Sequence, residues 1–325
     1  MNTSAQPRIA IHEVAPRDGL QMEPVFVPTD DKVAWLDHLS TLGYAKIEVT
    51  SFVSPTAIPA LRDAEEVMRR IRRAPGVVYT ALVPNARGAE RAIDGRADEF
   101  NLVMSASATH NLANLRMTQA QSFRSLAEVT RQAQQAGIAV NVSLSCAFGC
   151  PMEGEVPAAT VLDWTRQFAD LGVRRLTLCD TTGMADPGQV LALCRAVQAA
   201  HPGLEFTAHF HDTRGLGGAN VFAALQAGIT RFDASLGGIG GCPYAPGASG
   251  NVATEDVVHL LTCLGYQCGL TVEGLYSASA QLSALLGHDL PSAVCRAGPR
   301  WQRHAPPADF EQTRARAIAR EAAAN

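Results

Sequence analysis

The sequence has few of the features that mark a secreted, membrane-spanning or disulfide-stabilised protein. Only 8 of its 325 residues are cysteine, too few for a disulfide scaffold of this length. No run approaches the roughly 18 apolar residues that a membrane helix needs, and the N-terminal residues lack the apolar core of a signal peptide. We therefore expect a cytoplasmic protein that does not interact with a membrane.

Charge of either sign is also sparse. Charged residues make up 18% of the chain, the net charge is −4 and the pI is about 6.1. This balance gives no electrostatic reason to expect binding to nucleic acid or to an anionic membrane. Apolar residues make up 47%, which is typical of a globular protein with an ample core, and the length fits two average domains or one large barrel.

Short β-rich runs alternate with longer stretches that have the apolar spacing of helices, such as 30–42 and 159–171. This alternation is typical of βα units around a parallel sheet. The eight predicted strands are 9–14, 46–50, 77–83, 99–104, 138–145, 174–179, 205–211 and 231–236. Four helix patterns end in a glycine just before a strand, at Gly43, Gly137, Gly172 and Gly228, where a left-handed residue ends a helix.

Eight such units predict an α/β fold, a (β/α)8 TIM barrel with additional C-terminal helices packed beside it, and a doubly wound open sheet is the alternative. We expect a single catalytic domain over 1–325, with the barrel core at about 9–254 and a helical extension at about 255–325. The polar, alanine-rich tail 310–325 predicts a loosely held helix.

A glycine-rich stretch, 237–251, carries one cysteine, Cys242, and one asparagine, Asn251. Composition alone also fits an exposed linker. The stretch lies between a predicted strand and a predicted helix, with Asn251 placed to cap that helix and with Glu255 and Asp256 in its early turns. It is therefore interpreted as a mobile loop around a site.

Reactive side chains gather where the predicted strands end, which is where barrel enzymes place their active sites. Arg17 and Asp18 follow the first strand, although an exposed ion pair is the alternative for them. Glu48 is an acid inside the apolar second strand, so it needs a partner, and this strand ends at Ser51. Asp180 ends the sixth strand.

The seventh strand ends with His209 and His211, which share one face because side chains alternate along a strand. Two histidines simply held by hydrogen bonds are the alternative to a metal site. With Asp18 and Asn251 they form a predicted ligand set of two nitrogen and two oxygen donors. Such a set suits Mg²⁺ or Mn²⁺, with Zn²⁺ or Co²⁺ as alternatives.

Five segments, taken in order, resemble 3-hydroxy-3-methylglutaryl-CoA lyase, a family of metal-dependent TIM barrels. They are 13–21 (EVAPRDGLQ), 48–55 (EVTSFVSP), 145–151 (SCAFGCP), 209–213 (HFHDT) and the glycine-rich stretch with 251–256 (NVATED). The resemblance covers about 9–285. The Gly-Gly-Cys-Pro-Tyr motif at 240–244 is specific for these lyases. The motifs Arg-Asp-Gly-x-Gln at 17–21 and His-x-His at 209–211 also occur in related isopropylmalate and homocitrate synthases.

The resemblance implies a homodimer that binds an acyl-CoA and holds a divalent cation through Asp18, His209, His211 and Asn251. It implies retro-Claisen cleavage to acetyl-CoA and acetoacetate, as in leucine catabolism and ketone body formation. Arg17 would stabilise the enolate, Asp18 or His209 would be the base, and Cys242 would donate a proton or seal the site. The residues expected to orient these groups or the substrate are Gln21, Glu48 beside Arg17, Ser51, Thr177, Asp180, Arg214, and Glu255 beside Asn251.

Several positions depart from the family pattern. Thr177 stands where serine is expected, Ser143 and Arg214 stand where tyrosine is expected, and Gly217-Gly218 replaces larger apolar residues. These positions lie near strand ends, so they leave the acyl substrate open. The alternatives are cleavage of citramalyl-CoA or a longer branched thioester, a condensing synthase, or a barrel that only binds a CoA ester.

Overall fold

All eight predicted strands are present in the computed structural model, which describes residues 7–241 and 250–324, and their ends lie within two residues of the predicted ones. The strands are β1 (Ala10–Glu13), β2 (Lys46–Ser51), β3 (Val78–Leu82), β4 (Glu99–Ser105), β5 (Ala139–Ser145), β6 (Arg175–Asp180), β7 (Glu205–Phe210) and β8 (Arg231–Ala234).

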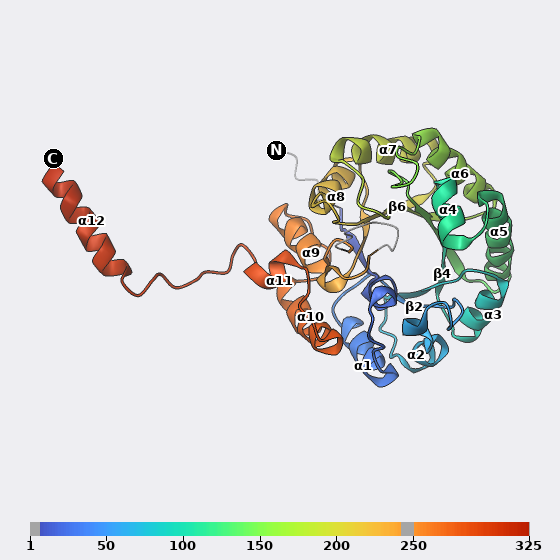
Figure 1. Ribbon diagram of the computed structural model, residues 1–325, viewed down its shortest axis with the longest axis horizontal. Helices are drawn as coiled ribbons and strands as arrows, with labels where there is room; N and C mark the ends of the chain where they lie inside the picture. The colour runs from blue at the N-terminus through green and yellow to red at the C-terminus, as the bar shows by residue number, and fades with distance from the viewer. Residues whose placement is uncertain (1–6, 242–249, 325) are drawn as a thin grey trace.

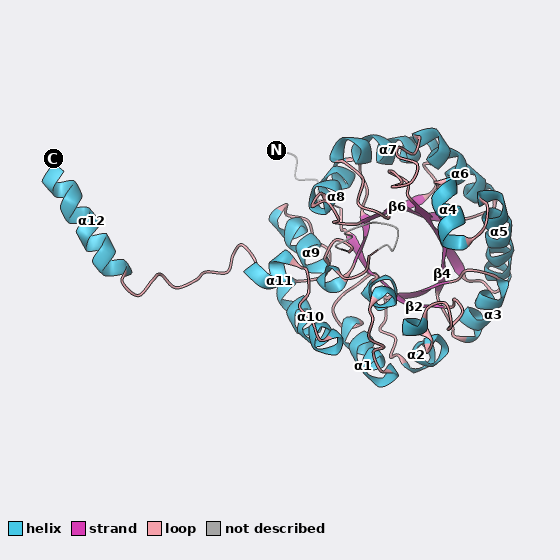
Figure 2. Ribbon diagram, in the orientation of Figure 1, coloured by secondary structure: helices cyan, strands magenta, loops and turns pink. Residues whose placement is uncertain are grey.

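The strands form a closed parallel barrel in chain order (Figure 2). β8 closes it by pairing with β1 over four residues, from Ala10 opposite Arg231 to Glu13 opposite Ala234. The predicted (β/α)8 barrel is therefore confirmed, and the doubly wound open sheet is wrong.

Helices lie around the barrel, and the last of them lies apart from it (Figure 1). They are α1 (Thr29–Leu39), α2 (Ala64–Arg70), α3 (Ala86–Asp94), α4 (Ala108–Leu115), α5 (Gln119–Gln135), α6 (Ala158–Asp170), α7 (Pro187–Ala200), α8 (Gly217–Gln226) and α9 (Thr254–Cys263), followed by α10 (Val272–Leu286), α11 (Ala293–Ala297) and α12 (Phe310–Ala324). Four short turns, η1 (Ala15–Gly19), η2 (Leu20–Met22), η3 (Pro59–Leu61) and η4 (Leu236–Gly238), lie between them.

The four glycines predicted to end helices all have a positive φ, between 70° at Gly137 and 104° at Gly43. In this left-handed region a side chain is strained, so glycine lets the chain turn back toward the barrel. Gly137, Gly172 and Gly228 directly follow the C-caps of α5, α6 and α8, as predicted, whereas α1 ends at Leu39, so the prediction that Gly43 ends a helix is wrong.

The two faces of the barrel wall differ in polarity. Apolar side chains such as Leu102, Val142 and Phe232 are buried in the core cluster that the strands share with the helices. The alternate positions line an interior cavity and are mostly polar, among them Lys46 and Glu99. These charges are paired: Glu99 binds both Lys46 and Arg175, and Arg175 also binds Glu205.

The helices after the barrel pack beside it, as predicted. Trp35 Nε1 of α1 donates to the Ala278 carbonyl of α10 at 3.3 Å. Asp256 of α9 accepts hydrogen bonds from Ser292 Oγ and from the Val294 N–H of α11, each at 2.8 Å. α12 lies apart from the barrel (Figure 1) and all its residues are exposed, which agrees with a loosely held helix.

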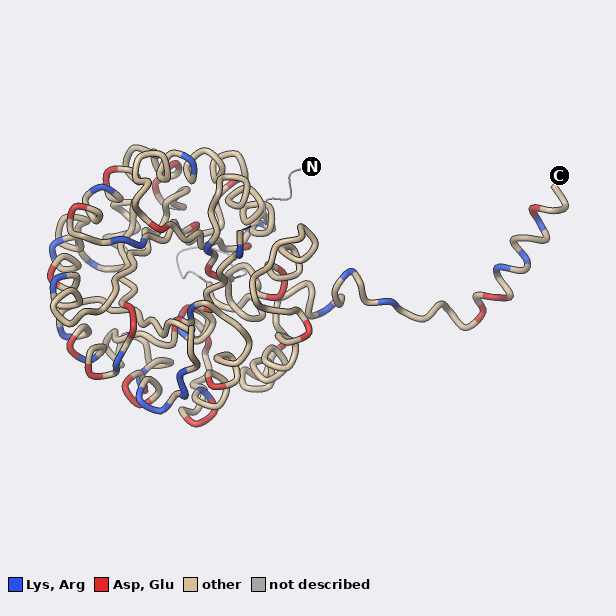
Figure 3. The backbone as a smooth tube through the Cα atoms, turned by 180° about the vertical axis from the view of Figure 1, so that it is seen from behind, with Lys and Arg blue, Asp and Glu red and all other residues tan. Residues whose placement is uncertain are grey.

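Basic and acidic positions alternate around the outer ring of helices (Figure 3). This pattern agrees with the small net charge of the sequence. Within the described ranges, no helix combines the length and the apolar character needed to cross a bilayer.

Removing residues 306–325 should leave the melting temperature within about 1 °C of the full chain, because α12 buries no side chain and apolar burial is what stabilises a helix in place. Thermal unfolding followed by circular dichroism measures this. As the matched control, ending the chain at residue 291 also removes the partners of Asp256 and should lower the melting temperature by several degrees. A large drop in melting temperature on removal of residues 306–325 would contradict the fold described here.

Candidate active site and metal centre

Arg17 and Asp18 lie in η1, the tight turn that follows β1. The Asp18 N–H donates to the Val14 carbonyl at 2.7 Å, and the neighbouring N–H groups of Arg17 and Gly19 share this acceptor. Glu13, at the end of β1, accepts the Ala15 N–H at 2.9 Å, so the turn is fixed at its start. Arg17 and Asp18 are 8% and 9% exposed, so the alternative of an exposed ion pair is wrong.

The Asp18 carboxylate is held by three donors. Oδ1 accepts from Arg17 Nη1 at 2.7 Å and from Gln21 Nε2 at 3.2 Å, and Oδ2 accepts from Asn251 Nδ2 at 2.8 Å. Burial favours the neutral acid, but Arg17 and the two nearby imidazoles outweigh it and hold the pKa of Asp18 below its usual range. The group is therefore an anion fixed in place.

His209 and His211 face Asp18 from the end of β7. Their Nε2 atoms lie 3.1 Å apart, and His209 Nε2 is 4.0 Å from Asp18 Oδ2. Burial and the neighbouring His209 lower the pKa of His211 to about 3. Burial also opposes charge on His209, but the Asp233 carboxylate beside it raises the pKa of His209 above the ordinary value.

Backbone pairing brings Asn251 next to the two histidines. An antiparallel bridge pairs it with His211, and the flanking Gly250 carbonyl and Val252 N–H bond to the chain around the end of β7. The prediction that Asn251 caps the following helix is wrong. The helix begins at Thr254 after Ala253, and the Asn251 amide instead donates to Asp18 and to the Ile239 carbonyl.

One oxygen and two ring nitrogens, from Asp18, His209 and His211, lie within 4.8 Å of one another, close enough to share an ion. Asn251 Oδ1 is buried and has no hydrogen-bond partner in the described ranges, which is costly unless it binds something. The donor set therefore fits a divalent cation with mixed nitrogen and oxygen ligands.

Glu48 fixes the other side of Arg17. Its Oε2 lies 2.7 Å from Arg17 Nη2, and its Oε1 accepts from Asn101 Nδ2 at 2.8 Å. The guanidinium thus lies between two carboxylates, Asp18 and Glu48, which outweigh the effect of burial and raise its pKa. Arg17 Nε is buried without a partner among the described residues.

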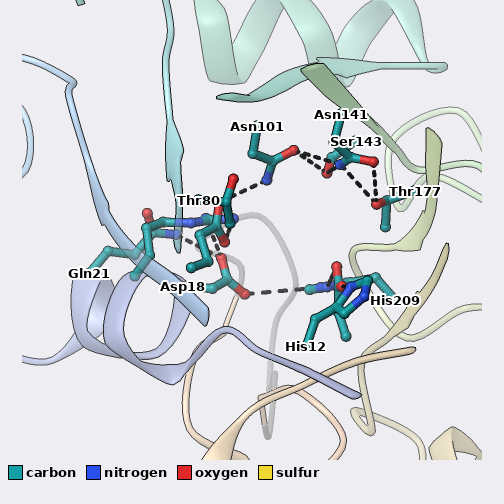
Figure 4. A network of polar contacts seen from close by, with 12 residues as sticks. His12, Asp18, Gln21, Thr80, Asn101, Asn141, Ser143, Thr177 and His209 are labelled. Carbon is teal, nitrogen blue, oxygen red and sulfur yellow. Dashed lines mark hydrogen bonds and ion pairs between the residues drawn. The ribbon is translucent and has the colours of Figure 1, made fainter. Parts of the chain in front are cut away.

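A polar network continues from Asn101 across β4, β5 and β6 (Figure 4). Asn101 Oδ1 accepts from Ser143 Oγ at 2.8 Å and from Asn141 Nδ2 at 3.0 Å, and Asn141 Nδ2 also donates to Thr177 Oγ1 at 3.0 Å. The predicted site residue Thr177 therefore lies in this network and is linked through Asn141 and Asn101 to Glu48.

The side chains of Asp180 and Arg214 bond to the backbone of the loop after β6. Asp180 Oδ1 accepts the Met184 N–H at 2.7 Å, and burial raises the pKa of this carboxyl to about 6. Its Oδ2 is buried without a partner in the described part of the chain, so its orienting role stays a prediction. Arg214 Nη1 donates to the Gly183 carbonyl at 2.8 Å, which fixes the loop after β6.

The hydrogen bonds of Glu255 in the described residues go to groups other than Asn251, so its orienting role toward Asn251 stays a prediction. On the first turn of α9 its carboxylate accepts the Gly237 N–H at 2.9 Å and the Ser279 hydroxyl, and it therefore supports η4. Ser51 Oγ accepts the Val53 N–H at 3.3 Å. Cys242 lies outside the described residues.

Two residues that sequence reasoning missed, His12 and Asp233, lie next to the candidate ligands. Asp233 Oδ1 is 2.9 Å from His12 Nδ1, and Oδ2 is 3.3 Å from His209 Nδ1. Burial opposes the charge on Asp233, but the two imidazoles hold its pKa well below the usual range. The available signal was an ionisable side chain inside a predicted strand, as at Glu48.

The fold and the site together define a TIM barrel with a candidate divalent-metal centre at the carboxyl ends of β1 and β7, completed by the segment after β8. The chain belongs to the HMGL-like family, whose family model matches residues 8–282.

Individual relatives agree with this assignment. The chain is 46% identical to hydroxymethylglutaryl-CoA lyase YngG of Bacillus subtilis over 285 residues, 88% of this chain and 95% of that protein. It is 41% identical to (R)-citramalyl-CoA lyase of Chloroflexus aurantiacus over 301 residues, 90% and 95% of the two chains. The solved structure of an HMG-CoA lyase from Acinetobacter baumannii in complex with coenzyme A and 3-methylmalate matches with a TM-score of 0.88 and 47% identity, covering 92% of this chain and 98% of that one.

Gly240→Ala should weaken Mn²⁺ binding by about ten- to hundredfold, a range typical of changes next to metal ligands. At Gly240, where φ is +95°, a Cβ atom would lie 2.8 Å from both Asn251 Nδ2 and the Asp18 carbonyl oxygen. Isothermal titration with Mn²⁺ measures the change. Gly203→Ala is the matched control, because a Cβ there meets nothing within 4 Å. Equal affinities for the two variants would argue against the proposed ligand positions.

Mn²⁺ affinity should rise about tenfold per pH unit between pH 5 and the raised pKa of His209. His209 must lose one proton to bind the ion, whereas His211, with a pKa of about 3, and the ionised Asp18 release none in this range. Titrations at several pH values give the slope of the logarithm of affinity. A slope near zero or near two would contradict the release of a single proton from His209.

Proposed function

We propose that the protein is a divalent-metal-dependent carbon–carbon lyase that cleaves 3-hydroxy-3-methylglutaryl-CoA to acetyl-CoA and acetoacetate. The observation that carries the proposal is the fixed Arg17 guanidinium beside Asp18, His209 and His211. The relatives named hydroxymethylglutaryl-CoA lyase, similar over nearly their whole length, support it. The cofactor is Mg²⁺ or Mn²⁺, held by Asp18, His209, His211 and Asn251.

The reaction needs a base for the tertiary hydroxyl and positive charge for the enolate that leaves. A divalent cation at this site would polarise the hydroxyl oxygen and lower its pKa. Asp18 would accept the hydroxyl proton, or His209 would accept it when its Nε2 is not bound to the cation, because its Nδ1 faces Asp233. The C2–C3 bond then breaks as the hydroxyl carbon becomes a ketone. The electron pair passes to the thioester enolate.

Arg17 stabilises the enolate oxygen. Because Asp18 and Glu48 hold its guanidinium on two sides, the charge is oriented before the substrate binds, and preorganised charge of this kind typically supplies about 3–4 kcal/mol. Cys242, which follows η4 in the sequence, is proposed to return a proton to the enolate carbon or to close the site. We also propose that residues 1–325 act as one catalytic domain in a cytoplasmic homodimer.

Cleavage of citramalyl-CoA is the second candidate. It is favoured by the 41% identity to (R)-citramalyl-CoA lyase. A condensing synthase of the same barrel group is the third candidate function.

The purified chain, with Mg²⁺ or Mn²⁺, should release acetyl-CoA from 3-hydroxy-3-methylglutaryl-CoA, as measured by chromatography, and a chelator should abolish the release. Parallel reactions contain citramalyl-CoA, or acetyl-CoA with a 2-oxoacid. Faster cleavage of citramalyl-CoA would favour the second candidate, and consumption of acetyl-CoA would favour the synthase. Turnover of none of these would reject the lyase function.

Arg17→Gln should lower kcat by about two to three orders of magnitude, because it removes the charge that stabilises the enolate. Mn²⁺ affinity should change much less, since the candidate ligands stay in place. Steady-state kinetics and Mn²⁺ titration separate the two effects. Arg72→Gln is the control, because Arg72 is 85% exposed and pairs with Asp37 on the outside. A near-normal kcat in Arg17→Gln would remove Arg17 from the catalytic residues.

A further inference from the structure

A buried chain of two imidazoles and one carboxylate runs beneath the candidate metal centre. His12 of β1 contacts Asp233 of β8, and Asp233 contacts His209 of β7. His12 is 5% exposed, His209 is 8% exposed, and the Asp233 side chain is 12% exposed. Neither His12 nor Asp233 has a role in the function proposed above.

We propose that His12 is a positioning residue for the metal centre, because it holds the Asp233 carboxylate in the orientation in which Asp233 holds His209. This inference rests on the proposed metal site. In this arrangement His209 directs Nδ1 to Asp233 and Nε2 toward Asp18 and His211. Figure 4 shows His12 and His209 on the same side of the site, opposite the Asn101 network.

The two oxygens of Asp233 contact different strands. Oδ1 is 2.9 Å from His12 and Oδ2 is 3.3 Å from His209, so rotation of the carboxylate would break both contacts. If His12 is lost, the longer contact to His209 is the one that still holds the carboxylate among the described residues. A partner that fixes the ring orientation of a ligating histidine typically changes metal affinity by 10- to 100-fold.

His211 gives an internal contrast. Its Nδ1 is buried without a partner in the described ranges, and its position is set by the backbone bridge to Asn251. Of the two candidate histidine ligands, His209 is the one whose Nδ1 contacts a side chain in the described residues. The effect of His12 should therefore pass through His209.

Lys46 does not replace His12 as the partner of Asp233. It lies opposite His12 in the register of β1 and β2 and lines the same interior cavity, but its ammonium group pairs with Glu99. Asp233 therefore has the His12 ring as its second partner.

The test compares Mn²⁺ binding by full-length His12→Leu and His12→Asn, measured by isothermal titration without CoA ligands. The leucine cannot donate a hydrogen bond, and its variant should bind Mn²⁺ about tenfold or more weakly. The asparagine amide nitrogen lies about where His12 Nδ1 lies, so this variant should stay within about threefold of the parent protein. His38→Leu, which removes an imidazole bonded to Gln281 on the outer helices, should bind normally.

Unchanged affinity in His12→Leu would overturn the inference, as would equal losses in the leucine and asparagine variants at equal melting temperatures. If His12→Leu does not fold, Asp233→Asn decides, because an amide has only one accepting oxygen for two imidazoles. It should also bind Mn²⁺ about tenfold or more weakly, and normal binding would overturn the inference. If the variants show the expected Mn²⁺ affinities but the parent protein has no lyase activity, the proposed function is rejected and the role of His12 is not.

Discussion

The pairing of β8 with β1 is the constraint on which the candidate site depends. It places η1 beside the segment after β8, so Asp18 contacts Asn251, 233 positions away in the sequence. Glu13 strengthens this junction: its carboxylate accepts the N–H groups of Ala15 and Leu236 and the hydroxyl of Thr254. One buried acid thus holds together the turn that carries Asp18 and the segment that leads to Asn251.

The polar barrel interior supports the same arrangement from below. Burying charge is costly, and a buried ion pair adds little net stability compared with apolar packing. The pairs Lys46–Glu99 and Arg17–Glu48 are therefore better explained by positioning than by stability. Because Glu48 also bonds to Asn101, the orientation of Arg17 is determined by contacts that reach across several strands.

Much of the fold was predictable because it rests on local rules. Strand runs predicted all eight strands, and helix periodicity followed by a glycine predicted the ends of α5, α6 and α8. The closeness of the His209 and His211 rings was predictable because residues two positions apart in a strand share one face. The Asn251 cap was wrong because a local preference for asparagine before a helix lost to a tertiary bridge with His211 and a bond to Asp18. His12 and Asp233 were missed because their contact joins residues 221 positions apart.

We infer that Asp18, His209, His211 and Asn251 converge on one divalent ion. Crystals of the protein grown with Mn²⁺ and measured for anomalous scattering test this arrangement directly. We expect one strong peak within about 2.0–2.3 Å of a side-chain donor atom of each of the four residues. A peak ligated by other residues, or no peak at this site in Mn²⁺-saturated crystals, would contradict it.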